Sequence, residues 1–178
     1  MTKLPVKLTN LPNELKSAKD FYDFLGVGTA ERSFLEKYAG YRYTEVSIPK
    51  RRGGTRILFV PERRLKFLQR KTLKLLQQLH RPRNPVHGFV KDRGAITNAN
   101  AHQTRPYLLN LDLRNYFGVI SRRRVFGMLV SLGLKDEAAL AICSICTTRD
   151  QLPQGAPTSP ILSNMIAFRL DRTLLNFA

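Results

Sequence analysis

The chain has 178 residues, which fits one ordinary domain that can bury a hydrophobic core. Hydrophobic residues make up 43% and charged residues 24% of the chain, as is normal for a globular protein. No apolar run approaches the ~20 residues needed to cross a bilayer, so we expect no membrane-spanning helix and no membrane partner.

The charge of the chain points to a polyanionic partner. The sequence has 30 Lys and Arg against 13 Asp and Glu, a formal net charge of +17. Folding does not require this excess, because like charges repel one another in the compact state. A Lys or Arg that neutralises a phosphate also releases counterions, which favours nucleic acid as the partner. The alternative is a basic protein that is merely soluble or that binds anionic lipid.

The amino-terminal segment and the cysteines indicate a reducing compartment. The sequence MTKLPVKLTN has no apolar signal core. Cys143 and Cys146 lie in the apolar run LAICSIC, and no second Cys/His pair completes a zinc site. We therefore predict two reduced core cysteines in a cytoplasmic protein.

The predicted elements begin with two short helices. Residues 12–25 form the first, which ends at Gly26. Its apolar side consists of Leu15, Phe21, Tyr22 and Leu25. The second helix follows Thr29, and its predicted buried face consists of Phe34, Leu35 and Tyr38.

A β-hairpin and a basic helix follow. Residues 41–49 alternate in polarity, 50–54 are a basic turn with two glycines, and 55–60 (TRILFV) are β-rich, which predicts an antiparallel hairpin over 41–60. Pro61 then opens a helix over 62–80. Its apolar stripe, interrupted by Thr72, consists of Leu65, Leu68, Leu75, Leu76 and Leu79. Basic side chains occupy much of the remainder: Arg63, Arg64, Lys66, Arg70, Lys71 and Lys74.

The second half of the chain mixes loops, helices and one apolar strand. After a loop at 81–94 and a short helix near 95–102, the run YLLNLDL at 107–113 predicts a strand. Ser121 is the predicted N-cap of a helix through Leu132, and 135–147 form another helix. A loop at 149–160 precedes a final helix over 159–177. These elements predict a mixed α/β or α+β domain, and α+β is the fold class that we expect.

Two residues of this half are candidates for chemistry. Asp112 lies inside the apolar strand, where ionisation costs energy unless a cation or hydrogen-bond donors compensate. A core aspartate that caps a neighbouring helix is the alternative. Phe117 follows shortly after, where an aromatic ring could close the floor of a nucleotide pocket. Core packing is its alternative role.

Two loops have compositions suited to a nucleotide. In the run LPQGAPTSP, Gly155 permits a close backbone approach, the prolines fix the loop's shape, and the Gln154 amide can donate and accept. The turn at 50–55 places an ammonium, guanidinium groups and glycine backbone together, which suits a triphosphate. A solvated basic hairpin tip is the alternative for that turn.

In this order, the motifs resemble the reverse transcriptase family. IPKRRGGTRILFVP is similar to its fingers hairpin, LNLDLRNYF to its first palm motif, and LPQGAPTSPILSN to its second. The intervening HGFVKDRGAITNANAH contains the N-A-x-x-H pattern of retron reverse transcriptases, from Asn98 to His102. The resemblance covers roughly residues 30–178. It implies an α+β fold that combines polymerase fingers with an incomplete palm.

The resemblance implies a role for each matching residue. Asp112 would be the catalytic carboxylate that binds Mg²⁺, assisted by the Leu113 carbonyl. Phe117 would exclude the 2′-hydroxyl of a ribonucleotide. The residues implied to bind the incoming dNTP are Lys50, Arg56, Leu113, Phe117, Gln154 and Gly155.

The resemblance also implies partners: a structured non-coding RNA, an RNA/DNA hybrid and dNTPs, with a role in defence against phage. Asn98 and His102 would contact the RNA, with helix capping and packing as the alternative. Our own candidates for contacts to the nucleic-acid backbone are Arg63, Arg64, Lys66, Arg70, Lys71, Lys74, Arg122, Arg123 and Arg124.

One part of the family pattern is missing from the sequence. The family holds two metal ions with the first palm carboxylate and the adjacent acids of a Tyr-x-Asp-Asp turn, and these 178 residues contain no such turn. We therefore predict a helical segment at 1–40, fingers at 41–105 and a partial palm at 106–178. Without the missing hairpin, the strand that carries Asp112 should leave an open sheet edge and an uncovered apolar face.

Several explanations for the missing turn remain open at this point. The chain could be half of a split enzyme whose second chain supplies the rest of the palm and the thumb, a truncated gene product, or a domain repurposed for binding RNA. A group II intron-like reverse transcriptase and a non-catalytic RNA-binding module are the alternative functions.

Overall fold

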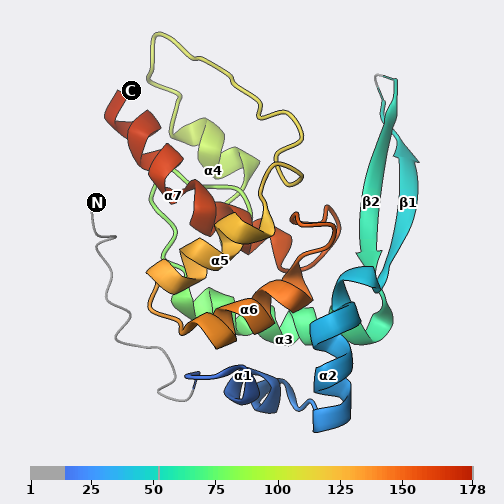
Figure 1. Ribbon diagram of the computed structural model, residues 1–178. Helices are drawn as coiled ribbons and strands as arrows, with labels where there is room; N and C mark the ends of the chain where they lie inside the picture. The colour runs from blue at the N-terminus through green and yellow to red at the C-terminus, as the bar shows by residue number, and fades with distance from the viewer. Residues whose placement is uncertain (1–14, 52, 178) are drawn as a thin grey trace.

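The computed structural model describes residues 15–51 and 53–177, which form a helical body from which one β-hairpin projects (Figure 1). The hairpin consists of β1 (Tyr43–Pro49) and β2 (Thr55–Pro61), paired antiparallel with Tyr43 opposite Pro61. The helices are α1 (Ala18–Leu25), α2 (Thr29–Tyr38), the 3₁₀ turn η1 (Ala39–Tyr41), α3 (Arg63–Leu79), α4 (Ala95–Asn100), α5 (Arg122–Ser131), α6 (Asp136–Cys146) and α7 (Ser159–Phe177). The predicted helix-rich fold with one hairpin is confirmed.

Local sequence signals set the ends of these helices. Ser17 and Asp20 form a capping box at the start of α1, and Gly26 ends that helix with a left-handed φ of 72°. Ser121 caps α5 as predicted, accepting a hydrogen bond from the Arg124 N–H at 3.3 Å. The first predicted helix, 12–25, is confirmed from Ala18 onward, and 12–14 lie outside the described residues.

The hydrophobic core surrounds α6, which is packed against α1, α2, α3 and α5. Its buried residues lie on nearly all sides of the helix: Ala138, Ala139, Ala141, Ile142, Cys143, Ser144, Ile145 and Cys146. Both thiols are free and buried as predicted, and burial raises the pKa of each to about 12. They therefore remain protonated at neutral pH and act as small apolar side chains.

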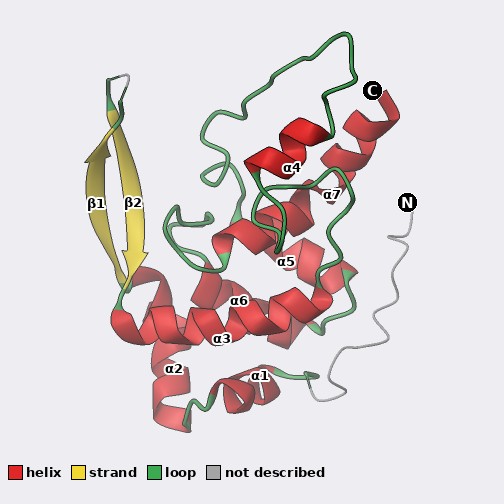
Figure 2. Ribbon diagram, turned by 180° about the vertical axis from the view of Figure 1, so that it is seen from behind, coloured by secondary structure: helices red, strands yellow, loops and turns green. Residues whose placement is uncertain are grey.

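Helix α3 supplies the other main wall of the core, running along the base of the body from the end of the hairpin (Figure 2). The predicted leucine stripe is confirmed, because all five leucines are buried. Thr72, its polar interruption, is also buried, and its hydroxyl donates to the Leu68 carbonyl at 3.0 Å. That bond explains how a polar residue fits within the stripe.

A buried amide joins the hairpin to the helical body. The Gln69 Nε2 group donates to the Tyr43 hydroxyl at 2.7 Å and to the Ile145 carbonyl at 2.9 Å. The Ile145 carbonyl belongs to the last turn of α6, where helical carbonyls lack partners within the helix. Burial also raises the pKa of the Tyr43 hydroxyl. One side chain therefore connects β1, α3 and α6.

The predicted strand at 107–113 is wrong. In the structure this segment is irregular and exposed, with Tyr107 91% and Leu109 77% accessible. A strand forms only where a neighbour accepts and donates its backbone hydrogen bonds, and the one sheet among the described residues is β1–β2. Among the described residues, no segment pairs with this apolar run.

The predicted buried face of α2 is only partly right. Leu35 is buried, whereas Phe34 and Tyr38 are exposed and pack on each other with ring centroids 5.2 Å apart. The Arg42 guanidinium covers the Phe34 ring at 5.3 Å. Phe34 thus contacts Tyr38 and Arg42 at the surface, where we had predicted packing in the core. In the parts of the chain that the structure describes, no helix combines the length and apolar composition needed to cross a membrane.

We expect Gln69→Leu to destabilise the fold. The substitution removes the amide donor shared by Tyr43 and Ile145 and leaves them only the 3.3 Å bond from the Tyr43 hydroxyl to the Ile145 carbonyl. A buried polar group that loses a partner costs about 1–3 kcal/mol. The Gln69 Oε1 atom, which has no partner among the described residues, also disappears and offsets part of this loss. The free energy of unfolding in urea should fall by about 1–2 kcal/mol.

Gln77→Leu is the matched control, because Gln77 lies on the same helix and is exposed. Its free energy of unfolding should change by less than about 0.5 kcal/mol. Equal effects of the two substitutions would contradict the role that we give to Gln69.

Candidate nucleotide and nucleic-acid site

The loop at 152–158 is docked onto the hairpin. The Phe59 N–H donates to the Gln154 carbonyl at 2.8 Å, which joins β2 to the loop. Gly155 adopts a φ of 125°, and a Cβ atom there would lie 3.0 Å from the Phe59 carbonyl oxygen. The predicted close backbone approach at Gly155 is confirmed, because both its conformation and its surroundings require glycine.

The base of this loop is held from the body. The Leu152 N–H donates to the Ile120 carbonyl at 3.0 Å, and the buried Ser159 hydroxyl donates to the Pro153 carbonyl at 2.7 Å. The hairpin, the loop and the start of α7 therefore form one connected framework. Gln154 is half-buried within it, whereas Gly155 remains accessible.

The two cations implied for the triphosphate lie on the projecting hairpin. Lys50 begins its turn, where its N–H donates to the Gly54 carbonyl at 3.0 Å and its carbonyl accepts from Gly53 at 3.1 Å. Arg56 lies on β2 opposite Ile48. Both side chains are exposed, and neither takes part in an ion pair of the described residues.

Asp112 and Leu113 lie in the exposed irregular segment, whereas Phe117 is half-buried against the core. The neighbouring Tyr116 fixes this end of the segment, because its hydroxyl donates to the Ser163 carbonyl of α7 at 3.1 Å and its ring lies 5.8 Å from that of Phe117. Phe117 therefore packs against the core beside a tyrosine that is bonded to α7, while Asp112 is not held by any described side chain.

The described residues do not by themselves fit the implied Mg²⁺ site. No group of three or more His, Cys, Asp or Glu side chains among them could hold a metal ion. Mg²⁺ prefers octahedral coordination by oxygen, and one exposed carboxylate at Asp112 does not provide it.

The basic side chains of α3 form two rows. Arg63, Lys66, Arg70 and Lys74 follow one another at spacings of three and four residues, so they share one face of the helix. Arg64 and Lys71 lie on the neighbouring face, above the Phe67 ring at 5.6 and 5.2 Å. We call the first set, Arg63, Lys66, Arg70 and Lys74, the α3 stripe. It is basic and differs from the buried leucine stripe of the same helix.

The second row is engaged within the protein. Arg64 makes a bidentate ion pair with Glu31 of α2 at 2.7 and 2.8 Å, and this pair lowers the pKa of the Glu31 carboxyl. Lys71 donates to the Leu25 carbonyl at the end of α1 at 2.8 Å. These two cations hold α1 and α2 against α3, whereas the α3 stripe makes no ion pair within the described residues.

The remaining nucleic-acid candidates lie on other elements. Arg123 and Arg124 are exposed in the first turn of α5, whereas Arg122 is half-buried and donates to the Ser144 hydroxyl at 3.0 Å. Asn98 lies in α4 and His102 just after it, and both are exposed.

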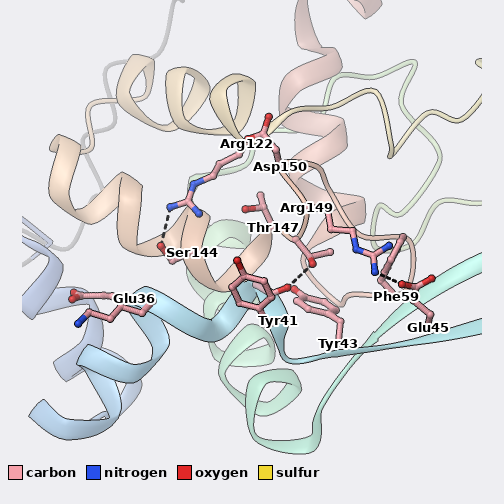
Figure 3. A pocket seen from close by; sticks show the side chains of 13 residues that line it. Glu36, Tyr41, Tyr43, Glu45, Phe59, Arg122, Ser144, Thr147, Arg149 and Asp150 are labelled. Carbon is pink, nitrogen blue, oxygen red and sulfur yellow. Dashed lines mark hydrogen bonds and ion pairs between the residues drawn. The ribbon is translucent and has the colours of Figure 1, made fainter.

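A cavity of about 530 Å³, which the sequence did not predict, lies at the base of the hairpin (Figure 3). Its lining includes Tyr41, Phe59, Arg122, Ser144, Arg149 and Asp150. These residues come from η1, β2, α5, α6 and the turn after α6, so no single stretch of sequence marks the cavity. The only local signal is the Arg149-Asp150 pair, because aspartate tolerates the left-handed conformation that this turn requires.

Comparison with known proteins gives the family. The family model for reverse transcriptase (RNA-dependent DNA polymerase) matches residues 48–177. The retron Mx65 reverse transcriptase of Myxococcus xanthus is 37% identical over 154 residues, which cover 76% of this chain and 36% of that protein. The retron Mx162 reverse transcriptase of the same species is 30% identical over 183 residues, covering 90% of this chain and 38% of that protein.

A third relative comes from a different bacterium. The retron Ec86 reverse transcriptase of Escherichia coli is 33% identical over 143 residues, which cover 79% of this chain and 44% of that protein. The chain thus spans less than half the length of these relatives. The matched residues include the hairpin turn with β2, the segment with Asp112 and the loop with Gln154. The chain therefore belongs to the reverse transcriptase family, and within it to the retron type.

Proposed function

We propose that this chain supplies the fingers and the front of the palm to an RNA-directed DNA polymerase that copies RNA with dNTPs. The observation that carries the proposal is the docking of the loop with Gln154 and Gly155 onto the hairpin with Lys50 and Arg56. Residues 41–105 would be the fingers and 106–178 part of the palm, preceded by a helical segment at 1–40.

The proposed nucleotide site lies between the hairpin and the loop. Lys50 and Arg56 would bind the triphosphate, since Arg presents a planar fork that suits phosphate oxygens. Gln154 and Gly155 would contact the nucleotide and the template base. Phe117, which is positioned by packing against the core, would exclude a 2′-hydroxyl.

Asp112 would serve as one ligand of a Mg²⁺ site that further carboxylates complete. The exposed apolar segment at 107–113 supports this proposal, because it requires a covering partner. We propose that the partner is the hairpin with the Tyr-x-Asp-Asp turn, supplied by more of the same protein or by a second chain. Pairing with that hairpin would turn the segment into the strand that its sequence predicts.

The α3 stripe and the arginines of α5 would bind a structured non-coding RNA and its RNA/DNA hybrid. Cations in the first turn of a helix oppose the helix dipole, so Arg123 and Arg124 cost stability unless an anion is near. Asn98 and His102 would contact the same RNA. We further propose that the protein acts in the cytoplasm and takes part in defence against phage.

A non-catalytic RNA-binding module is the second candidate. The observation in its favour is that the described residues include no group of side chains able to hold a metal ion. A group II intron-like enzyme has less support, because the reported relatives are retron reverse transcriptases.

Primer extension tests the polymerase proposal directly. The chain would be mixed with a polypeptide that carries the Tyr-x-Asp-Asp hairpin and the thumb of a close relative, together with an RNA template, primer, dNTPs and Mg²⁺. We expect DNA synthesis in the mixture and at least a roughly 10²-fold loss with Asp112→Asn, since a lost electrostatic partner in an active site costs about that much.

Asp23→Asn is the control for that substitution, because Asp23 is exposed on α1 and its ion pair within the described residues is with Lys19. It should leave the rate of synthesis unchanged. RNA binding without synthesis in any mixture would favour the non-catalytic module, and synthesis unaffected by Asp112→Asn would exclude the role given to that carboxylate.

Gly155→Ala should weaken dNTP use. The added methyl group would lie 3.0 Å from the Phe59 carbonyl oxygen at a φ of 125°, so the loop must move away from the hairpin. We expect the KM for dNTPs to rise about tenfold and the free energy of unfolding to fall by about 1–3 kcal/mol. Gly127→Ala is the control, since nothing lies within 4 Å of its Cβ position.

Binding to RNA should depend on salt through the α3 stripe. Replacing Arg63, Arg70 and Lys74 together with Gln removes up to three phosphate contacts, so the slope of log affinity against log salt should decrease by about 2–3. Fluorescence anisotropy at several salt concentrations measures this slope. Lys19→Gln should leave it unchanged, because that amine pairs with Asp23. An unaltered slope in the triple variant would remove the α3 stripe from the RNA-binding surface.

A further inference from the structure

The cavity of about 530 Å³, which we call the hairpin-base pocket, lies on the face of β2 opposite to the proposed nucleotide site. Phe59 contributes to its lining, whereas Arg56 and Leu58 point to the other face because side chains alternate along a strand. The pocket therefore differs from the site of the incoming dNTP. Its size lies within the roughly 300–1,000 Å³ of small-molecule sites.

The walls of the pocket are rigidly held. The Thr148 hydroxyl donates to the Gly40 carbonyl at 2.5 Å, which fixes the turn after α6 against η1. The Thr147 hydroxyl donates to the Cys143 carbonyl at 2.7 Å, and the Ser144 hydroxyl donates to the Leu140 carbonyl at 3.0 Å. These bonds prearrange the cavity without a ligand, which lowers the ordering cost of binding.

The turn that closes the pocket is conformationally strained. Arg149 and Asp150 have φ values of 48° and 59°, and Thr148 and Gln151 exchange backbone hydrogen bonds of 2.9 and 3.0 Å across them. A tight turn with two left-handed residues usually contains glycine or asparagine. Here the strain places two charged side chains at the cavity, and strain of this kind tends to persist at binding sites.

An aromatic ring stands at the pocket with little packing of its own. Tyr41 is 83% accessible, although it lies at the junction of η1 and β1 beside the cavity (Figure 3). On the β2 side, the Arg149 guanidinium covers the Phe59 ring at 5.2 Å and also pairs with Glu45. The pocket thus offers one accessible aromatic face and one guanidinium plane, surfaces on which nucleobases stack.

Hydrogen-bonding groups complete the lining. Arg122 has five N–H donors, and the described residues provide one side-chain acceptor for them, the Ser144 hydroxyl at 3.0 Å. The Asp150 carboxylate belongs to the same lining and forms no ion pair within the described residues. Figure 3 shows it near the start of α5, whereas the Arg122 guanidinium reaches toward Ser144. The lining therefore offers donors and an acceptor, and the edge of a base presents both kinds of group.

We propose that the hairpin-base pocket binds one unpaired base of a single-stranded RNA segment, stacked on Tyr41 and hydrogen-bonded by Arg122 and Asp150. The inference rests on the RNA partner of the proposed function and adds a site to it. The opposite charges that line the cavity argue for a neutral, flat group inside it, while the net charge of +17 retains the surrounding phosphates. A base stacked here would hold a single strand on the outer face of the fingers.

The test measures the full chain's affinity for a short single-stranded RNA and for a duplex of the same sequence, by fluorescence anisotropy. We expect Tyr41→Ala to weaken single-strand binding about tenfold, and by the same factor at low and high salt, because stacking releases no counterions. Tyr41→Phe should retain affinity, since the ring remains. Duplex binding should not change, because a paired base cannot enter the pocket.

Tyr38→Ala is the matched control, a half-exposed tyrosine of α2 that is absent from the pocket lining. It should leave single-strand affinity unchanged. As a second readout, a photoreactive 4-thiouridine in the RNA should crosslink to the peptide that contains Tyr41, and Arg122→Met should weaken that crosslink. Thermal melts verify that each variant folds. We expect Tyr41→Ala to fold, because the Tyr41 side chain is largely exposed.

The outcomes separate the two proposals. Binding of the single strand with equal affinity in the Tyr41→Ala and Tyr38→Ala variants, or crosslinks that map outside the pocket, would overturn the base-binding inference and leave the proposed polymerase function standing. Loss of single-strand affinity in both variants alike would also overturn it. A chain that binds neither RNA overturns both proposals together.

Discussion

The buried amide of Gln69 is the interaction on which the arrangement of this molecule depends. It donates to the Tyr43 hydroxyl of the hairpin and to the Ile145 carbonyl at the end of α6. A two-stranded hairpin is at best marginally stable alone in water, so its position must come from contacts with the body. The amide provides such a contact at the first residue of β1, where the hairpin leaves the body.

A second hydrogen bond joins the hairpin to the loop of the proposed nucleotide site. The Phe59 N–H bond to the Gln154 carbonyl docks the loop onto β2, and Gly155 permits the approach. Side chains of β2 therefore point to two different sites, one on each face of the strand. Arg56 points toward the proposed dNTP site, while Phe59 lines the hairpin-base pocket. A change in the hairpin's position therefore affects both faces, which would couple a strand held on the outer face to the nucleotide site on the other.

The sequence was sufficient for those parts of the fold that depend on neighbouring residues. The Ser121 cap, the Gly26 end and the leucine stripe of α3 follow from local chemistry, and the structure contains all of them. The segment at 107–113 failed because strand formation depends on a distant partner. The hairpin-base pocket escaped prediction for the same reason, since its walls come from α2, η1, both strands, α5, α6 and the turn after α6. The placement of Asp112, Lys50 and Arg56 in a working site remains a prediction.

The distribution of charge shows why cations of similar sequence context have different roles. Arg64 and Lys71 look equivalent to Arg70 and Lys74 along α3, yet the first two are bound to Glu31 and to the Leu25 carbonyl. Those contacts position α1 and α2, so their loss would affect stability before it affected an RNA ligand. The α3 stripe has no such internal task among the described residues. In the proposed function, RNA is the polyanion that would offset the mutual repulsion of these cations and of the net charge of +17.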